Sequence, residues 1–184
     1  MRHLPARDRK AVPWKNGGGV TVEIAVHPEG AGFDTFDWRV SLASVASDGP
    51  FSLFPAVDRT LTVLTGAGID LTVGGAAPVR LDPSVAPFAF PGDVAASATL
   101  VDGPIEDLNV MTRRGRMTHT VARRGLKAGT TVSIACPAGL VFVTGACRFD
   151  TLDLSARDAV LVPAARTVTL VATEDGAVFT IALG

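Results

Sequence analysis

Cysteine is scarce in this chain, and long apolar runs are absent from it. The two cysteines, Cys136 and Cys147, are too few for a disulfide framework, and we expect both to be buried, reduced thiols. No charged-then-apolar leader stands at the start, and no apolar run approaches the roughly 18 residues that a membrane-spanning helix needs. We therefore expect a soluble, cytoplasmic protein without a membrane partner.

An excess of either charge is missing as well. Seventeen Lys and Arg against 18 Asp and Glu give a formal net charge of −1, so no global field attracts nucleic acid. Residues 112–127 hold six of the seventeen basic residues, but no aromatic residue is interleaved with them, as nucleic-acid binding would require. We interpret this segment as a solvated connector or edge strand, and we expect no nucleic-acid partner.

Helical periodicity longer than two turns is also lacking. Short stretches such as 21–26, 37–45 and 178–183 instead have the composition and alternation of strands, and turns rich in the 19 glycines and 12 prolines separate them. Regularly spaced short strands indicate an all-β sandwich or barrel. With 184 residues, the chain can form one domain or two small halves.

An internal repeat favours two halves. Three features recur in the same order, namely residues 63–67 and 142–146, residues 88–91 and 160–163, and the Asp-Gly turns at 102–103 and 175–176. Three matches in one order indicate a duplication. We therefore assign residues 1–115 to an N-terminal half and residues 116–184 to a C-terminal half. The second copy is almost purely apolar, and we expect it to act as a packing partner.

Several motifs between residues 13 and 111 carry a resemblance to a known family. They are Trp14-Lys15-Asn16-Gly17-Gly18-Gly19 with Thr21 and Glu23-Ile24, Trp38-Arg39-Val40-Ser41, Asp48-Gly49-Pro50-Phe51-Ser52, Asp58-Arg59, Phe90-Pro91-Gly92-Asp93 and Asp107-Leu108-Asn109-Val110-Met111. On these motifs the chain resembles the HutD/Ves family, and the duplicated strands resemble a double cupin. The resemblance implies two cupin-like jelly-roll barrels, a bicupin, in one compact chain. Ala56 stands where the family pattern has glycine, which alters one turn.

The same resemblance implies a function in bacterial histidine utilisation. It implies a metal-free bicupin that binds or senses a small carboxylate metabolite, of the urocanate or formyl-amino acid class, and it brings no established reaction and no cofactor. Cupin motifs usually hold a metal through two or three histidines and a glutamate. Here the histidines are His3, His27 and His119, and none lies in the matching segments 51–66 and 90–103. We therefore predict no metal site.

The candidate ligand site is built around an arginine on a core face. Arg59 shares a strand face with Leu61 and Val63, because side chains alternate along a strand. A guanidinium keeps its charge, so its burial requires an anion. If the polar faces of the motifs point into the first barrel, an arginine there can hold a small organic anion through two parallel bonds. The candidate ligand-binding residues are Lys15, Asn16, Gly17, Glu23, Arg39, Ser41, Phe51, Phe54, Arg59, Asp107 and Asn109.

Other interpretations of the same residues stay open. Glu23 with Arg39, and Asp107 with Arg59, are alternatively ion pairs that join neighbouring strands. The chain is alternatively a metal-free isomerase or hydrolase, with Glu23 or Asp107 as general base and Arg59 stabilising charge. No Ser-His-Asp or Cys-His arrangement supports that alternative, so we assign no catalytic residue. Exposed edge strands make a homodimer a further option.

Overall fold

A computed structural model describes residues 1–14 and 18–184 of the chain. The chain divides into two compact units. We call Lys10–Thr118 the N-terminal unit, and Met1–Arg9 together with His119–Gly184 the C-terminal unit. The division differs from the predicted halves, 1–115 and 116–184, because the first nine residues belong with the end of the chain. No helix in the described part of the chain is long and apolar enough to cross a membrane.

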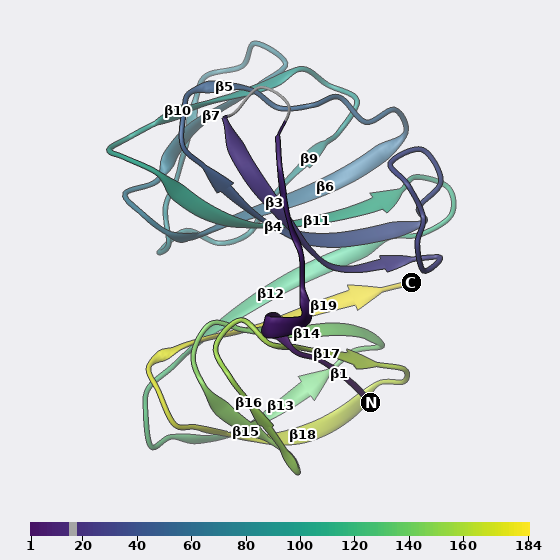
Figure 1. Ribbon diagram of the computed structural model, residues 1–184, viewed down its shortest axis with the longest axis vertical. Coiled ribbons are helices and arrows are strands. Elements are labelled where there is room, and N and C mark those ends of the chain that lie inside the picture. Colours follow the sequence, from purple (N-terminus) through teal and green to yellow (C-terminus); the bar gives the residue numbers. More distant parts are fainter. Residues whose placement is uncertain (15–17) are drawn as a thin grey trace. The chain divides into compact units, whose positions relative to one another are not determined.

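The N-terminal unit is built from two antiparallel sheets, which Figure 1 shows as two layers. One sheet has the strand order β2-β3-β4-β11-β6-β9, and the other has the order β5-β10-β7-β8. The strands are β2 (Ala11–Pro13), β3 (Gly19–His27), β4 (Trp38–Val45), β5 (Gly49–Pro50), β6 (Val57–Thr65), β7 (Ile69–Val73), β8 (Val79–Leu81), β9 (Phe88–Pro91), β10 (Ala96–Leu100) and β11 (Ile105–Arg113).

The core of the N-terminal unit lies between these two sheets. Alternate residues of β4 and β6, such as Ala43, Leu61 and Val63, pack with Leu71 and Ala98 of the second sheet. The alternation follows from strand geometry, in which successive side chains point to opposite faces. Burying this apolar surface drives the two sheets together. Any polar residue in phase with Leu61 or Ala43 is therefore directed toward the core.

The C-terminal unit repeats this construction around its own core. Its sheets have the orders β1-β17-β14-β19-β12 and β13-β18-β15-β16, with apolar side chains such as Phe149, Val160 and Leu170 packed between them. Its elements are β1 (Arg2–Leu4), the 3-10 helix η1 (Ala6–Asp8), β12 (His119–Leu126), β13 (Thr131–Cys136), β14 (Gly139–Val143), β15 (Cys147–Phe149), β16 (Leu152–Leu154), β17 (Ala159–Val162), β18 (Arg166–Ala172) and β19 (Gly176–Leu183).

The two units share one strand order. The run β9-β6-β11-β4 of the N-terminal unit corresponds to β17-β14-β19-β12 of the C-terminal unit, and β5-β10-β7-β8 corresponds to β13-β18-β15-β16. The repeated sequence segments lie at matching places, because 63–67 spans the end of β6 and the turn after it as 142–146 does for β14, and 88–91 forms β9 as 160–162 falls in β17. The all-β prediction is confirmed, and the internal repeat is visible in the topology.

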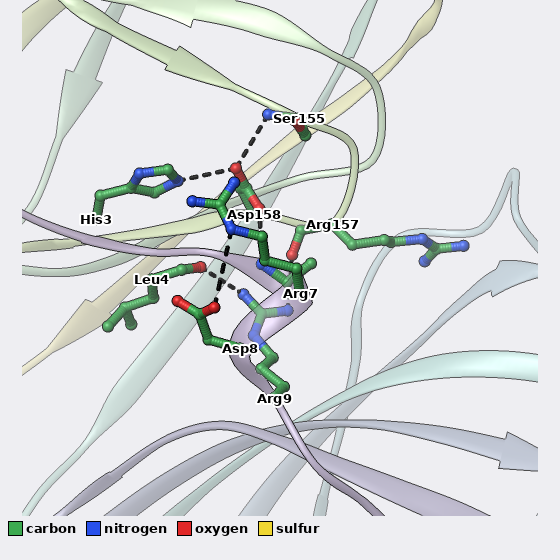
Figure 2. A network of polar contacts seen from close by, with 9 residues as sticks. His3, Leu4, Arg7, Asp8, Arg9, Ser155, Arg157 and Asp158 are labelled. Carbon is green, nitrogen blue, oxygen red and sulfur yellow. Dashed lines mark hydrogen bonds and ion pairs between the residues drawn. The ribbon is translucent and has the colours of Figure 1, made fainter.

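A hydrogen-bond network around Asp158 holds the first nine residues against the rest of the C-terminal unit. The carboxylate of Asp158 lies 2.8 Å from Nε2 of His3 and accepts hydrogen bonds from the backbone N–H groups of Ala6 and Ser155 at 2.7 and 3.0 Å. Arg9 adds bonds from its guanidinium to the backbone oxygens of Leu4 and Arg157 (Figure 2). Strand β1 pairs with β17 beside this network.

The basic segment is not a solvated connector throughout. Its arginines near the end of β11 bind inside the N-terminal unit: Arg113 donates to the backbone oxygen of Phe36 at 2.9 Å, and Arg116 pairs with Asp37 at 2.9 Å. The later part forms β12, an edge strand of the C-terminal unit. The expectation for the cysteines is confirmed, since Cys136 and Cys147 are buried, free thiols.

Candidate functional site

Polar residues from three neighbouring strands meet on the core-facing side of the larger N-terminal sheet. In the register of this sheet, Met111 of β11 lies opposite Arg39 of β4 on one side and Arg59 of β6 on the other. Two residues along, Asn109 lies opposite Ser41, and next comes Asp107 opposite Ala43. Two register shifts, at Glu106/Asp107 and at Glu23/Ala25, interrupt the ladder here. Such bulges redirect side chains.

Arg59 is the central cation of this face. Only 3% of it is exposed, and its guanidinium carbon lies 5.1 to 5.5 Å from the ring centres of Phe51, Phe54 and Phe90. Its one hydrogen bond to the described residues is long, 3.4 Å from Nη1 to the backbone oxygen of Ser52, and its buried Nε has no partner among them. The aromatic faces attract the cation but do not satisfy its N–H donors.

The Pro-Gly turn after β9 fixes the position of Arg59 and of one of these rings. The N–H of Gly92 donates to the backbone oxygen of Val57, and its oxygen accepts from the N–H of Phe54 at 2.8 Å. Nearby, Arg114 binds both Asp58 and Asp93, with closest distances of 2.7 and 2.9 Å. The acids of the Asp58-Arg59 and Pro91-Gly92-Asp93 motifs therefore hold the ends of β6 and β9 together rather than facing the core.

Asp107 is the anionic counterpart on the same face. It is 1% exposed, and neither of its carboxylate oxygens has a hydrogen-bond partner among the described residues. Burial raises the pKa of Asp107 to about 7, the charge of Arg59 opposes this rise, and Glu106 adds to it. The neighbouring Oδ1 of Asn109 is likewise buried and without a partner within the described chain. Buried polar groups are nearly always hydrogen-bonded, so this cluster departs from the usual pattern.

Arg39 differs from Arg59 although both lie on one row. Its Nε donates to Oε2 of Glu23 at 2.8 Å, and its guanidinium stacks on Phe33 at 4.8 Å. The ring of Phe33 in turn contacts that of Phe54, with centres 5.7 Å apart. The ion-pair interpretation therefore holds for Glu23 and Arg39. Asp107 and Arg59 do not form a hydrogen-bonded ion pair, because the oxygens of Asp107 make no hydrogen bond to any described residue.

The structure brings most of the predicted residues together. Ser41 is 2% exposed and lies opposite both Asn109 and Glu23. Lys15, Asn16 and Gly17 lie outside the described residues. The predicted set missed Phe33 and Phe90, which complete the aromatic surroundings of the two arginines. For Phe90 a signal existed, because it stands in the Phe90-Pro91-Gly92-Asp93 motif, whereas Phe33 lies in a turn region without one.

The donor set of this face does not fit a metal ion of the kind that many cupins hold. Among residues 1–14 and 18–184, no three His, Cys, Asp or Glu side chains gather closely enough to bind one. The buried face instead combines one carboxylate and one amide with the guanidinium of Arg59, a permanent cation that repels a metal.

Comparison with known proteins gives consistent matches along the chain. The family model described as HutD matches residues 6–180. A Pseudomonas putida protein, described as an uncharacterized 21.2 kDa protein in the hutC 3' region, is 44% identical over 111 residues, or 60% of this chain. The match spans 57% of that relative's length. Protein Ves of Citrobacter koseri is 38% identical over 144 residues, which cover 78% of this chain and 72% of the relative.

Solved structures extend the likeness over the whole fold. A Pseudomonas aeruginosa protein of unknown function superposes with a TM-score of 0.85 at 32% identity, covering 99% of this chain and 97% of the other. HutD from Pseudomonas fluorescens, described in a formate condition, gives 0.79 at 29% identity, covering 100% and 98%. Oxalate decarboxylase from Lactobacillus farciminis gives 0.72 at 8% identity over 98% of this chain and 85% of the other, which shows a shared fold alone.

Proposed function

Because the chain belongs to the HutD/Ves family, we propose that it is a bicupin that binds a small organic anion in bacterial histidine utilisation. The ligand class is a carboxylate such as urocanate or a formyl-amino acid, and the binding site is the core-facing side of the larger N-terminal sheet. The repeated strand order of the two units supports the bicupin description.

The observation that carries this proposal is the state of Arg59. A buried guanidinium is costly unless an anion and hydrogen-bond acceptors compensate it. Arg59 is 3% exposed, yet the described residues offer it one long hydrogen bond, three aromatic faces and the charge of Asp107, which makes no hydrogen bond to it. A carboxylate supplies both the charge and two acceptors in the geometry that a guanidinium matches. Arg39 is less suited to this role, because Glu23 already neutralises it.

The names of two relatives support the metabolic setting. The Pseudomonas putida relative is described by its position in the hutC 3' region, and the Pseudomonas fluorescens relative is named HutD. Formate appears in the description of the latter structure, and it is the smallest carboxylate that Arg59 could hold through two parallel bonds. We therefore include formate beside the metabolites of histidine breakdown as a ligand to test.

The test is ligand binding measured together with thermal unfolding. We expect formate, urocanate or N-formylglutamate to raise the melting temperature, because a ligand that binds only the folded state stabilises it. Arg59→Met should abolish this shift, and Arg59→Lys should weaken binding about tenfold or more by removing the two-pronged geometry. Arg148→Met, at an exposed arginine of the C-terminal unit, is the control and should keep the shift. If none of these carboxylates binds the wild-type protein, the proposal is wrong.

One observation favours a second candidate, a metal-free enzyme acting on a small organic acid. A carboxyl group with a pKa near 7 is suited to take and return protons at neutral pH, and burial raises the pKa of Asp107 to about 7. Incubating urocanate or N-formylglutamate with the protein and following the ligand by NMR tests this candidate. Turnover that is lost in Asp107→Asn while binding is retained would support it, and an unchanged ligand would count against it.

A further inference from the structure

The acceptors beside Arg59 place a requirement on the ligand that a bare carboxylate does not meet. Both oxygens of Asp107 and Oδ1 of Asn109 are buried and unpaired within the described chain. An ionised carboxylate can only accept hydrogen bonds, so it needs N–H or O–H donors. A ligand that brings only acceptors would satisfy Arg59 but would leave Asp107 unpaired and add a second negative charge near it. Such a complex is penalised twice.

Arg59 and Asp107 lie on the same core-facing side of the sheet and interact electrostatically. Each shifts the pKa of the other through its charge. Asp107, Asn109 and Met111 follow one another on the same face of β11, about 7 Å apart at each step, and Met111 is the residue opposite Arg59. The amide of Asn109 can present either its oxygen or its nitrogen and so can accept or donate. The need for a donor on the ligand therefore comes from Asp107.

We propose that the ligand is an organic anion that also carries an N–H or O–H donor, and that Asp107 is the specificity-determining residue that accepts it, with Asn109 assisting. The carboxylate of the ligand binds Arg59, and the donor binds Asp107. This inference rests on the proposed function and narrows it. N-acylated amino acids and acids with an N–H-bearing heteroaromatic ring belong to the class, whereas simple alkyl or aryl carboxylates do not.

Matched ligand pairs test the requirement for a donor directly. trans-Urocanate has a ring N–H, and trans-3-(2-furyl)acrylate has a ring oxygen in a closely similar shape. N-acetylglycine has an amide N–H, and O-acetylglycolate has an ester oxygen in its place. Calorimetric titration of the wild-type protein at pH 8 should show the donor-bearing member of at least one pair binding roughly tenfold to a hundredfold more tightly, the range that a buried hydrogen bond to a charged group supports.

The variant Asp107→Asn assigns the preference to its residue. Asparagine keeps the shape but removes the negative charge, so the ratio within a pair should fall to a few-fold or less. Affinity for the furyl acid should rise at the same time, because the repulsion has gone. Asp153→Asn is the matched control, since that side chain is 92% exposed in the C-terminal unit. It should leave both affinities unchanged.

The outcomes separate this inference from the proposed function. If none of the four compounds binds, this inference is wrong, and the proposed function is wrong as well if formate and N-formylglutamate also fail to bind. If the compounds bind but the members of each pair bind equally, the requirement for a donor is wrong while the anion site stands. An unchanged ratio in folded Asp107→Asn overturns the role of Asp107. If that variant does not fold, the wild-type protein at pH 5.5 replaces it. At that pH Asp107, on which the charges of Arg59 and Glu106 also act, is protonated and can donate a hydrogen bond as well as accept one. The ratio of affinities within each ligand pair should then be smaller than at pH 8, and an unchanged ratio overturns the role of Asp107.

Discussion

Gly92 lies directly against the side chain of Arg59. A Cβ atom built on Gly92 would stand 3.1 Å from Cδ and 3.2 Å from Cγ of Arg59, and 2.9 Å from the backbone oxygen of Val57. The last of these neighbours is backbone and cannot turn aside as a flexible side chain does. The absence of a side chain at Gly92 is therefore what allows Arg59 to extend among its three phenylalanine rings.

Gly92→Ala should consequently weaken anion binding and stability together. The added methyl group displaces Arg59 or β6, and overpacking of this kind costs about 1–3 kcal/mol of unfolding free energy. Urea unfolding and titration with trans-urocanate measure the two effects. Gly125→Ala is the control, because a Cβ there meets nothing within 4 Å. Unchanged urocanate affinity in folded Gly92→Ala would show that Arg59 does not depend on this contact.

The face on which Arg59 lies could be predicted from sequence, because alternation along a strand is a local property. The partners of the polar residues could not. Arg39 and Arg59 have the same phase and flank the same residue, Met111, yet one is paired with Glu23 and the other makes a single long hydrogen bond to the described residues. Such differences depend on side-chain geometry across strands that are distant in sequence.

Which unit the first residues belong to could not be predicted from sequence either, because their partners are also distant along the chain. His3 lies beside Asp158 although 155 positions separate them, and β1 pairs with β17. Residues 1–12 are polar and basic, a composition that fits either an edge strand or a loose arm. Nothing local in them identifies the strand on which they pair, so a boundary drawn from the internal repeat alone differs from the division into compact units.

Asp107 should make stability fall as pH rises from about 4 to about 7. Burial raises its pKa in the folded state to about 7, whereas an unfolded aspartate titrates near 3.9. Between these values the folded protein binds more protons than the unfolded chain, so raising the pH costs up to about 1.4 kcal/mol per pH unit from this group. Above about pH 7 the cost is constant.

The variant Asp107→Asn isolates this contribution. Its unfolding free energy, measured relative to the wild type in urea between pH 4.5 and pH 8, should increase with pH and level off above about pH 7. Absolute stability is a poorer readout, because the variant also deprives Arg59 of a nearby negative charge. Asp153→Asn should give a curve parallel to that of the wild type. Parallel curves for Asp107→Asn as well would mean that its carboxyl group titrates alike in both states.

Ala56→Gly should stabilise the protein. Ala56 has a φ of 54°, in the left-handed region that costs an alanine about 1–2 kcal/mol. Glycine adopts this region freely but loses more entropy on folding, so we expect a net gain of about 0.5–1 kcal/mol in unfolding free energy. The control is Ala76→Gly in an exposed loop, where the left-handed strain does not apply and stability should fall. A loss of stability in both variants would contradict this account of the turn.

Asp158→Ala should release the first residues from the C-terminal unit. Burial alone would raise the pKa of Asp158, but hydrogen bonds from Ala6, His3 and Ser155 outweigh it and lower the pKa. The charged carboxylate thus stabilises the fold at neutral pH, and this contribution is lost as the pH falls below about 4. Removing it leaves these three donors unpaired, which we expect to cost about 2–4 kcal/mol at pH 7.

Hydrogen exchange distinguishes this release from a general loss of stability. The amides of Leu4 and Ala6 should exchange faster in Asp158→Ala by a larger factor than the amides of β14, because β1 is held at the sheet edge by β17 and the Asp158 network. Asp153→Ala, at an exposed position in β16, should leave both sets unchanged. If protection in Asp158→Ala falls equally in β1 and β14, Asp158 supports the whole unit rather than its first strand.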